Sequence, residues 1–497
     1  MNIYSLIQEL LNYSLKYNLI STHEEIYSRN LLLDCFNLDE WNFPNNILEN
    51  RDLETLLENM CLWAIDNSLI NDSKAEMELL DTKIMNYVIP RPKEVIETFY
   101  KDYSISPETA TYNYYNFSKA TNYIRSKRIE KNLYWLSQTT YGDLEITVNL
   151  AKPEKDPKDI EREKNMPQSS YPSCLLCIEN VGYRGRLNHP ARQTHRVIPL
   201  TLGNEEWFLQ FSPYVYYNEH SIVFCKEHRL MKIDENAFSR LLEFVEKYPH
   251  YCIGSNADLP IVGGSILSHD HYQAGKHIFP MAKASVEKEF KVNQFPEISC
   301  AIVNWPISVI RLTGKNKNDI LKLSTHILNK WKNYSDIDAN ILAFSNETPH
   351  NTITPIVRKL GENYQMDLAL RNNRTNDEHP MGIFHPHSEV HNIKKENIGL
   401  IEVMGVAILP GRLEKEMADL ETLLKNNNWK DLILKDEALK KHFNWIEKIT
   451  EKYKNEITTD ILKKEIGKTF ATVLEHSGVF KKTESGKKYF DKFINIL

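Results

Sequence analysis

Two histidines and a glutamine alternate along the stretch GGSILSHDHYQAG, which spans residues 263–275. On a β-strand, side chains two residues apart lie on the same face, so His269, His271 and Gln273 would share one face. A neutral imidazole can attack phosphorus, and a neighbouring amide can donate a hydrogen bond to a phosphoryl oxygen as charge develops there. The glycine pair ahead of the histidines allows the backbone to approach phosphates closely. The pattern predicts a phosphoryl-transfer site, and the alternative is a structural or metal-binding strand.

A second candidate site begins at Cys174 and Cys177, whose two-residue gap is typical of a zinc knuckle. Such a knuckle needs two further ligands, and the candidates are His269 and His228, which follows a strand-like run. Together the four would make a closed, structural Cys2His2 zinc site. One alternative is a redox pair, which needs a βαβ context that the sequence does not show. The other is a pair of buried thiols without metal.

The stretch GYRGRLNHPARQTHRVIP, residues 182–199, is rich in arginine. A guanidinium group suits phosphate oxygens because it can form two parallel hydrogen bonds, so Arg192 and Arg196 are candidate substrate ligands. The alternative for any one of these arginines is a solvated basic loop. Lys152 and Asn256 are further polar candidates. The complete set of predicted substrate-binding residues is Lys152, Arg192, Arg196, Asn256, Gly263, Gly264 and Ser265.

A third group of histidines, His385, His387 and His391, lies in the segment FHPHSEVH. Three imidazoles within seven positions have the spacing to bind a metal ion. The segment has no nearby cysteine and no obvious set of carboxylates to complete such a site. We therefore interpret it as a polar loop rather than a metal site.

Composition narrows the class of protein. A chain of 497 residues is too long for one ordinary core and predicts two or three structural units. Hydrophobic residues make up 41% and charged residues 26%, which is typical of a globular protein. A net charge of −6 argues against nucleic acid as a main partner. No apolar run approaches the ~20 residues of a membrane span, and the N-terminal helix lacks the features of a signal peptide. We expect a cytoplasmic protein without a membrane partner.

Helical patterns dominate the two ends of the chain, and strand-like runs dominate its middle. HRVIPL, SPYVYY and SIVFC have the pattern of strands, and a helix is predicted over 236–248. A charged, proline-rich loop is expected over 151–173. The predicted class is α+β, with helices at both ends of an antiparallel core. The predicted units are a helical region at 1–143, two sheet-containing halves at 144–290 and 291–412, and a helical tail at 413–497.

Five motifs of the chain resemble one known family. YPSCLLC, GYRGRLNHPAR, SPYVYYNEH, PHYCIGSNADLPIVGGSILSHDHYQ and HNIKKENIGLIEVMG are similar to motifs of the second-type, bacterial galactose-1-phosphate uridylyltransferases, or UTP–hexose-1-phosphate uridylyltransferases. The likeness runs from about residue 80 to 415. The chain is also distantly similar to the first-type enzymes and to the histidine-triad superfamily. This resemblance implies two tandem histidine-triad-like halves, of which the first keeps the reactive histidines.

The resemblance also implies a reaction. The family exchanges uridylyl between UDP-glucose and galactose 1-phosphate, giving UDP-galactose and glucose 1-phosphate, through a covalent uridylyl-histidine. Carried over from the first-type motif, His271 is the nucleophile and Gln273 the donor to the phosphoryl group. By analogy with the first type, a homodimer is expected. The zinc ligands of the first type map onto Cys174, Cys177, His228 and His269.

This sequence departs from the family pattern at several positions. Asp270 stands in place of a proline, and Ala274 in place of an expected glycine. A second metal site of the first-type enzymes is not carried over, because Asp367 and Ala369 replace its two histidines. Two other functions are alternatives to uridylyl transfer. A histidine-triad hydrolase or phosphorylase is disfavoured by Gln273 at the end of the motif, and a non-catalytic nucleotide-sugar sensor has no need of a nucleophile.

Overall fold

The structure, a computed structural model, describes residues 2–44, 47, 51–150, 169–264, 266–454 and 457–497. The predicted substrate ligands Lys152 and Ser265 lie outside the described residues, as does most of the predicted loop at 151–173. The helices are α1 (Ile3–Lys16), α2 (Glu25–Cys35), α3 (Leu53–Asp66), α4 (Lys74–Asn86), α5 (Pro92–Tyr103), α6 (Pro107–Ala120), α7 (Ser126–Glu130), α9 (Glu235–Lys247), α10 (Pro280–Lys283), α11 (Lys317–Lys332), α12 (Leu400–Val403), α13 (Arg412–Leu423), α14 (Trp429–Lys435), α15 (Phe443–Tyr453), α16 (Thr459–Ser477) and α17 (Glu484–Ile494).

The strands form one large and two small sheets. They are β1 (Leu133–Thr139), β2 (Gly142–Asn149), β3 (Ile198–Leu202), β4 (Glu205–Phe211), β5 (Ser221–Cys225), β6 (Cys252–Gly254), β7 (His271–Gly275), β8 (Val286–Phe290), β9 (Ser299–Val303), β10 (Val309–Gly314), β11 (Phe344–Ser345), β12 (Thr348–Pro349), β13 (Asn351–Leu360), β14 (Asn363–Asn372) and β15 (Val406–Pro410). Together with the helices, these strands confirm the predicted α+β class.

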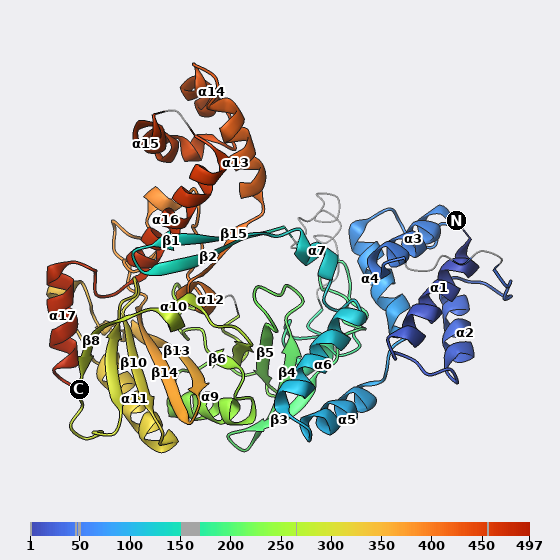
Figure 1. The fold of residues 1–497 in the computed structure, drawn as a ribbon, viewed down its shortest axis with the longest axis horizontal. Coiled ribbons are helices and arrows are strands. Elements are labelled where there is room, and N and C mark those ends of the chain that lie inside the picture. Colours follow the sequence, from blue (N-terminus) through green and yellow to red (C-terminus); the bar gives the residue numbers. More distant parts are fainter. Residues whose placement is uncertain (1, 45–46, 48–50, 151–168, 265, 455–456) are drawn as a thin grey trace.

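The large sheet has ten strands in the order β3-β4-β5-β7-β6-β13-β14-β10-β9-β8, and every neighbouring pair is antiparallel. The pairing of β6 with β13 joins two groups of five strands. Helices α9 and α11 cover one face of the sheet (Figure 1). β8 pairs with β9 and so lies with the second group, although 286–290 falls inside the predicted limits of the first half. The domain limits stay a prediction.

The opposite face of the large sheet carries a three-stranded sheet of β1, β2 and β15 (Figure 1). β15 runs parallel to β2, which brings the chain after residue 400 back beside residues 145–149. Helix α16 packs against β1, and helices α13 to α15 project beyond this small sheet. Among the described residues, none of the helices has the length and apolar character of a membrane-crossing segment.

The N-terminal helices α1 to α4 enclose a hydrophobic cluster of their own. The apolar face of α1 is buried there, and Asn2 caps that helix by accepting a hydrogen bond from the Tyr4 main chain at 2.9 Å. This cluster belongs to the helical end of the fold, away from the sheet. Its importance for function comes from α4, which reaches the cavity described below.

One predicted strand is wrong. SPYVYY, residues 212–217, is a loop between β4 and β5 rather than a strand. Val215 has a φ of +39° and Glu219 a φ of +54°, values in the left-handed region that an extended strand excludes. The His220 main-chain N–H donates to the Tyr217 carbonyl at 3.1 Å, which closes a turn just before β5 begins. Alternating aromatic residues alone did not separate this turn from a strand.

Candidate active site

Strand β7 carries the central part of the alternating motif. Its neighbours are β5 and β6, and Gln273 pairs with Ile222 on one side and Gly254 on the other. Tyr272 and Ala274 belong to the core beneath α9. Because side chains alternate along a strand, His271 and Gln273 point to the opposite face. Both line a cavity there.

The expectation that three side chains share one strand needs a correction. β7 begins at His271, so His269 precedes the strand. The His269 ring donates from Nε2 to the Cys225 carbonyl at 2.7 Å, and its Nδ1 lies 3.2 Å from the Cys174 sulfur. These two contacts turn the ring toward the cysteines. The regular spacing of the motif therefore serves two sites, one on each side of Asp270.

The His271 imidazole is prepared to act as a nucleophile. Its Nδ1–H donates to the His269 carbonyl at 2.7 Å, so the lone pair of the neutral ring is at Nε2. Burial lowers the pKa of His271 to about 4, because the charged form would lose its hydration. The side chain is neutral at physiological pH. A neutral imidazole beside an amide donor can attack an electrophilic phosphorus and stabilise the charge that develops on its oxygens.

The cavity has a volume of about 1240 Å³ and is built from segments far apart in the sequence. Besides β7, its walls include the loop around Arg192, the loop between β4 and β5 that ends at His220, and the segment containing Glu402. Lys74 and Leu79 of α4 form part of another wall. Such a volume is large enough for a nucleotide-sized ligand.

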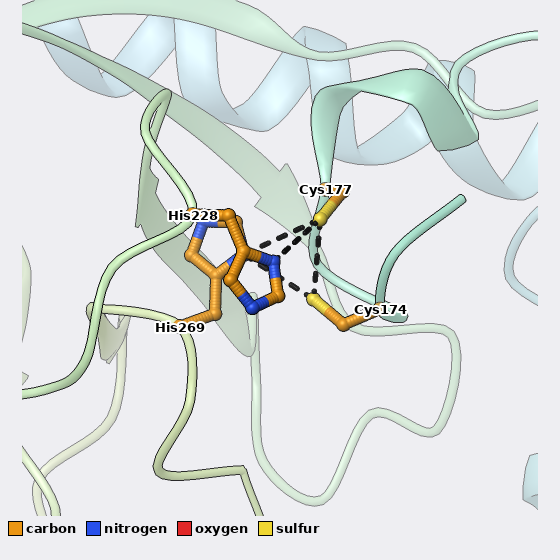
Figure 2. A group of neighbouring side chains, drawn as sticks. All are labelled: Cys174, Cys177, His228 and His269. Atoms are coloured by element: carbon orange, nitrogen blue, oxygen red, sulfur yellow. Dashed lines mark hydrogen bonds between the residues drawn. The ribbon is translucent and has the colours of Figure 1, made fainter. Parts of the chain in front are cut away.

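Four predicted metal ligands come together beside the cavity (Figure 2). The two sulfur atoms of Cys174 and Cys177 lie 3.4 Å apart, and Nδ1 of His228 lies 3.0 Å from the Cys177 sulfur. Nδ1 of His269 lies 3.2 Å and 3.7 Å from the two sulfurs. All four ligand atoms fall within 4.8 Å of one another. The sequence-predicted cluster is therefore a spatial cluster, with the chemistry of a Cys2His2 metal site.

The donor set fits zinc. A tetrahedral zinc ion with bonds of about 2.3 Å to sulfur and about 2.0 Å to nitrogen holds its ligand atoms ~3.3–3.8 Å apart. A small outward shift of the four groups would accommodate the ion. The hydrogen bond from His269 Nε2 to the Cys225 carbonyl leaves Nδ1 as the ligand atom, which is how proteins commonly orient a metal-binding histidine.

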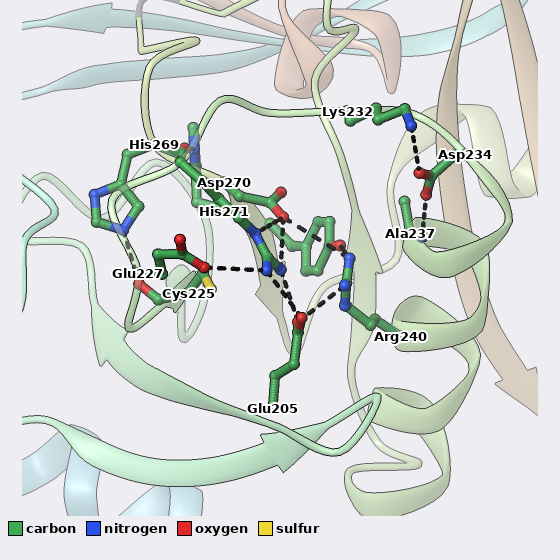
Figure 3. A network of polar contacts seen from close by, with 12 residues as sticks. Glu205, Cys225, Glu227, Lys232, Asp234, Ala237, Arg240, His269, Asp270 and His271 are labelled. Carbon is green, nitrogen blue, oxygen red and sulfur yellow. Dashed lines mark hydrogen bonds and ion pairs between the residues drawn. The ribbon is translucent and has the colours of Figure 1, made fainter.

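Asp270 is held by charged groups beneath the two histidines (Figure 3). Its carboxylate lies 3.4 Å from Arg229 Nε and 3.8 Å from Arg240, and both arginines also pair with Glu205. Burial raises the pKa of Asp270 to about 6, against the opposing effect of the arginines. The Asp270 main chain donates to the Arg229 carbonyl at 2.8 Å and accepts from the Cys225 N–H at 3.0 Å. This network restrains the main chain at Asp270, between His269 and His271.

The predicted basic ligands divide into two kinds. Arg192 lines the cavity. Arg196 is buried, and its guanidinium donates to the main-chain carbonyls of Pro90, Gln193 and His195 at 2.9–3.1 Å. It is not among the described residues of the cavity wall. Its hydrogen bonds tie the sheet to the N-terminal helices, and we do not carry it forward as a substrate ligand.

Asn256, Gly263 and Gly264 all line the cavity. The structure gives the glycines a packing reason that differs from the expected approach of phosphates. A Cβ atom at Gly264 would lie 2.6 Å from the Asn256 amide, and one at Gly263 would lie 2.6 Å from the Ala257 carbonyl oxygen. The Asn256 amide oxygen accepts from the Leu400 main chain at 2.8 Å. Gly264 thus leaves room for Asn256 to make its contact with Leu400, and Gly263 leaves room for the Ala257 carbonyl.

Sequence reasoning missed several residues of the cavity wall. Tyr216 and His220 come from the loop that was predicted as a strand, and Glu402 comes from the motif HNIKKENIGLIEVMG. Both motifs contributed to the family resemblance, but no residue within them was selected. Lys74 and Leu79 carry no local signal, because their place depends on how α4 packs against the rest of the fold.

The histidines of segment 384–391 lie in a loop between β14 and α12. His387 and His391 donate from Nε2 to main-chain carbonyls of this loop at 3.0 Å and 2.9 Å. His387, Glu389 and His476 come within 4.8 Å, but Nδ1 of His476 accepts from the His387 main chain at 3.2 Å. The neutral His476 ring then carries its proton on Nε2, which lies 3.4 Å from Glu389. These hydrogen bonds favour the predicted polar loop over a metal site.

Two family models match this chain in tandem. The model of the galactose-1-phosphate uridyl transferase N-terminal domain matches residues 18–229, and the model of its C-terminal domain matches residues 243–446. The two matches together span most of the chain. The first contains three of the four clustered metal ligands, and the second contains the His271 strand.

Curated relatives match over nearly full length. A galactose-1-phosphate uridylyltransferase of Fusobacterium nucleatum is 54% identical, over 100% of this chain and 99% of its own. Proteins of the same name from Halalkalibacterium halodurans and Bacillus subtilis are 53% and 48% identical, over 99% and 100% of this chain and 98% of their own. A crystal structure of yeast Ap4A phosphorylase Apa2 matches 60% of this chain and 90% of its own at 14% identity, with a TM-score of 0.30, which supports no argument about fold.

Proposed function

This chain belongs to the galactose-1-phosphate uridylyltransferase family, and on that premise we propose that it exchanges uridylyl between UDP-glucose and galactose 1-phosphate. The observation that carries the proposal is the His271 imidazole. It is neutral, it holds its proton on Nδ1 through the His269 carbonyl, and it lines a cavity of nucleotide size beside Gln273.

The proposed reaction has two displacements. Nε2 of His271 attacks the α-phosphorus of UDP-glucose, a P–N bond forms, and the P–O bond to the β-phosphate breaks, so that glucose 1-phosphate leaves. A phosphate oxygen of galactose 1-phosphate then attacks the same phosphorus, the P–N bond breaks, and UDP-galactose leaves. The amide of Gln273 donates a hydrogen bond to a phosphoryl oxygen in both steps. The covalent intermediate replaces one difficult transfer by two easier ones.

We propose zinc as the ion held by Cys174, Cys177, His228 and His269. When bound, zinc supplies a structural brace, because four protein ligands leave no open position for substrate. The protein residues do the remaining work. The main-chain carbonyl of His269 accepts a hydrogen bond from the His271 Nδ1–H, so an ordered His269 holds the nucleophile in one tautomer and one orientation.

Arg192, Asn256, Gly263 and Gly264 are the proposed substrate-binding residues that line the cavity. Arg192 offers a guanidinium for phosphate oxygens, and the others shape the wall next to β7. The predictions for Lys152 and Ser265 remain without structural detail. The predicted partners are UDP-glucose, UDP-galactose and hexose 1-phosphates, and the predicted cytoplasmic location and homodimer stay predictions.

The decisive experiment adds UDP-glucose alone to the purified enzyme. The proposal expects a burst of glucose 1-phosphate that stops near one equivalent per active site, together with protein that carries uridylyl. Adding galactose 1-phosphate should discharge the label as UDP-galactose. His271→Ala is the control, because it removes the attacking nitrogen. Sustained release without any acceptor would indicate a hydrolase, and binding without release would indicate a sensor.

A further inference from the structure

The motif SPYVYYNEH ends at a histidine whose ring is almost completely buried. The His220 side chain lies in the wall of the cavity, and the whole residue is 2% exposed. Its ring centroid lies 4.4 Å from that of Tyr217 and 5.6 Å from that of Tyr216. The His220 main chain is held as well, since its carbonyl accepts from the Ser212 N–H at 2.8 Å. The loop between β4 and β5 therefore holds the His220 imidazole in a fixed position.

Only one proton position satisfies this ring. Burial lowers the pKa of His220 to about 4, so the ring is neutral and carries a single N–H. Nε2 lies 3.1 Å from the Gln273 amide oxygen, whereas Nδ1 has no partner among the described residues. A proton on Nε2 forms a hydrogen bond, whereas a proton on Nδ1 would be buried without an acceptor, which is unfavourable. The N–H is therefore on Nε2 and donates to Gln273.

This contact determines which end of the Gln273 amide faces the cavity. A glutamine amide has an oxygen that only accepts and an NH2 that only donates, and rotation by 180° exchanges them. A flipped amide would place its NH2 against the His220 N–H, donor against donor. The observed orientation engages the oxygen with His220 and leaves the NH2 for other partners.

We propose that His220 is a positioning residue that keeps the Gln273 amide turned with its NH2 toward the phosphoryl group undergoing transfer. The inference rests on the proposed function, because the NH2 matters only if a phosphoryl oxygen arrives beside His271. It also assigns a role to the motif SPYVYYNEH, which has none in the proposed reaction. His220 acts through Gln273 and does not exchange a proton with the substrate.

The test compares three substitutions in two backgrounds. His220→Phe keeps a ring but removes the donor. His220→Asn is polar but too short to reach the Gln273 oxygen, and His220→Gln places an amide N–H near the position of Nε2. Each is made in the natural sequence and together with Gln273→Ala. The measurements are the single-turnover rate of uridylyl-enzyme formation, the KM for UDP-glucose, and the thermal unfolding midpoint.

The proposal expects His220→Phe and His220→Asn to lower the single-turnover rate by ~10–100-fold, part of the ~10²–10³ typical of losing such a donor outright. The KM for UDP-glucose should stay within about threefold, because uniform binding is not lost. His220→Gln should recover most of the rate. With Gln273→Ala already present, none of the three should lower the rate further. His220→Asn carries the test if the Phe variant does not fold.

Two results would overturn the inference. One is an equal loss of rate from His220→Phe or His220→Asn in both backgrounds, which would indicate an effect independent of Gln273. The other is a natural-background rate unchanged by either substitution. Failure of the proposed function looks different: the unsubstituted enzyme would then form no uridylyl-enzyme from UDP-glucose, whatever stands at position 220.

Discussion

Strands β7 and β14 occupy equivalent places in the two five-stranded groups, each directly next to the central β6–β13 pair. β7 presents His271 and Gln273 to a cavity. β14 presents Asp367, which is fully buried and pairs with Arg311 at 2.7 Å and Arg358 at 2.7 Å. Burial alone would raise the pKa of Asp367, yet the two arginines hold it below its ordinary value.

Equivalent strands of the sheet can therefore carry either a reactive side chain or a stabilising ion pair. His271 keeps one ring nitrogen, Nε2, available in a cavity, whereas Asp367 directs both carboxylate oxygens to arginines within the protein. Ala369, two residues further along β14, packs in the core beneath the small sheet. The polar side chain of β14 is thus engaged within the protein, whereas those of β7 face the cavity. Substitutions on β14 should therefore affect stability, and substitutions on β7 should affect activity.

The largest effect is expected at His271. His271→Ala removes the nucleophile, and because no other group replaces it, the exchange rate should fall by several orders of magnitude, on the order of 10⁴ or more. UDP-glucose should still bind, since the cavity walls remain. Exchange kinetics and equilibrium binding measure the two quantities. Exchange within tenfold of the unsubstituted enzyme would remove His271 from this role.

Asp367→Ala, on β14, should lower the stability of the protein rather than its rate. It leaves the buried Arg311 and the partly exposed Arg358 without their shared partner, and breaking such a pair typically costs about 3–5 kcal/mol in the free energy of unfolding. The rate per folded, active enzyme should change little, because Asp367 does not line the cavity described here. Denaturant unfolding gives the stability, and active-site titration with UDP-glucose gives the rate. A large loss of rate in stable protein would mean that β14 also takes part in the chemistry.

Gln273→Ala should have a smaller effect than His271→Ala on the same strand. Loss of one donor to a charge-developing oxygen costs ~10²–10³ in rate. The enzyme should still acquire uridylyl from UDP-glucose, only slowly, and its unfolding midpoint should hardly move. Rapid-quench labelling separates this outcome from a structural defect. Labelling at the original rate would place Gln273 away from the phosphoryl group.

Cys174→Ser should sharpen the distinction between chemistry and support within the first half. We expect about one zinc per chain in the unsubstituted protein, and less zinc and a lower unfolding midpoint in the variant. Activity should fall mainly through loss of folded protein. His269→Ala keeps the main-chain carbonyl that orients His271 but removes the ring that holds this residue against Cys225 and Cys174. Uridylyl transfer by folded enzyme should therefore slow as well. Metal analysis that finds fully active protein with well under one zinc per chain would reject the zinc proposal.

The spatial groupings that sequence anticipated depend on short-range spacing. A two-residue gap between cysteines and alternation along one strand are local patterns, and they led to the clustered metal ligands and to the cavity-lining His271 and Gln273. Local pattern failed where backbone conformation decided the outcome: Val215 adopts a positive φ angle inside the run predicted as a strand, and Glu219 does so two residues after it. Arg196 was assigned to substrate because its type suits phosphate, but its donors serve main-chain carbonyls.

Long-range packing explains the rest of what sequence did not predict. The hydrogen bond from Leu400 to Asn256 spans 144 positions, and no pattern in either segment announces the other. The same is true of Lys74, which reaches the cavity only because α4 lies against it. Residue types indicated the chemistry, whereas the walls that give the cavity its shape come from tertiary contacts.

The short strand β6 has a consequence for the order in which the molecule folds. Its middle residue, Ile253, pairs with Ala274 of β7 on one side and with Val357 of β13 on the other. The first pairing closes a loop of about 20 residues and the second one of about 100, so the second is the slower to form, because closing a longer loop costs more entropy. On the ribosome, β6 would remain an unpaired edge until β13 had emerged. The strand that carries His271 already lies between β5 and β6 at that stage, so it is β6 that is covered late, only after β13 has been synthesised.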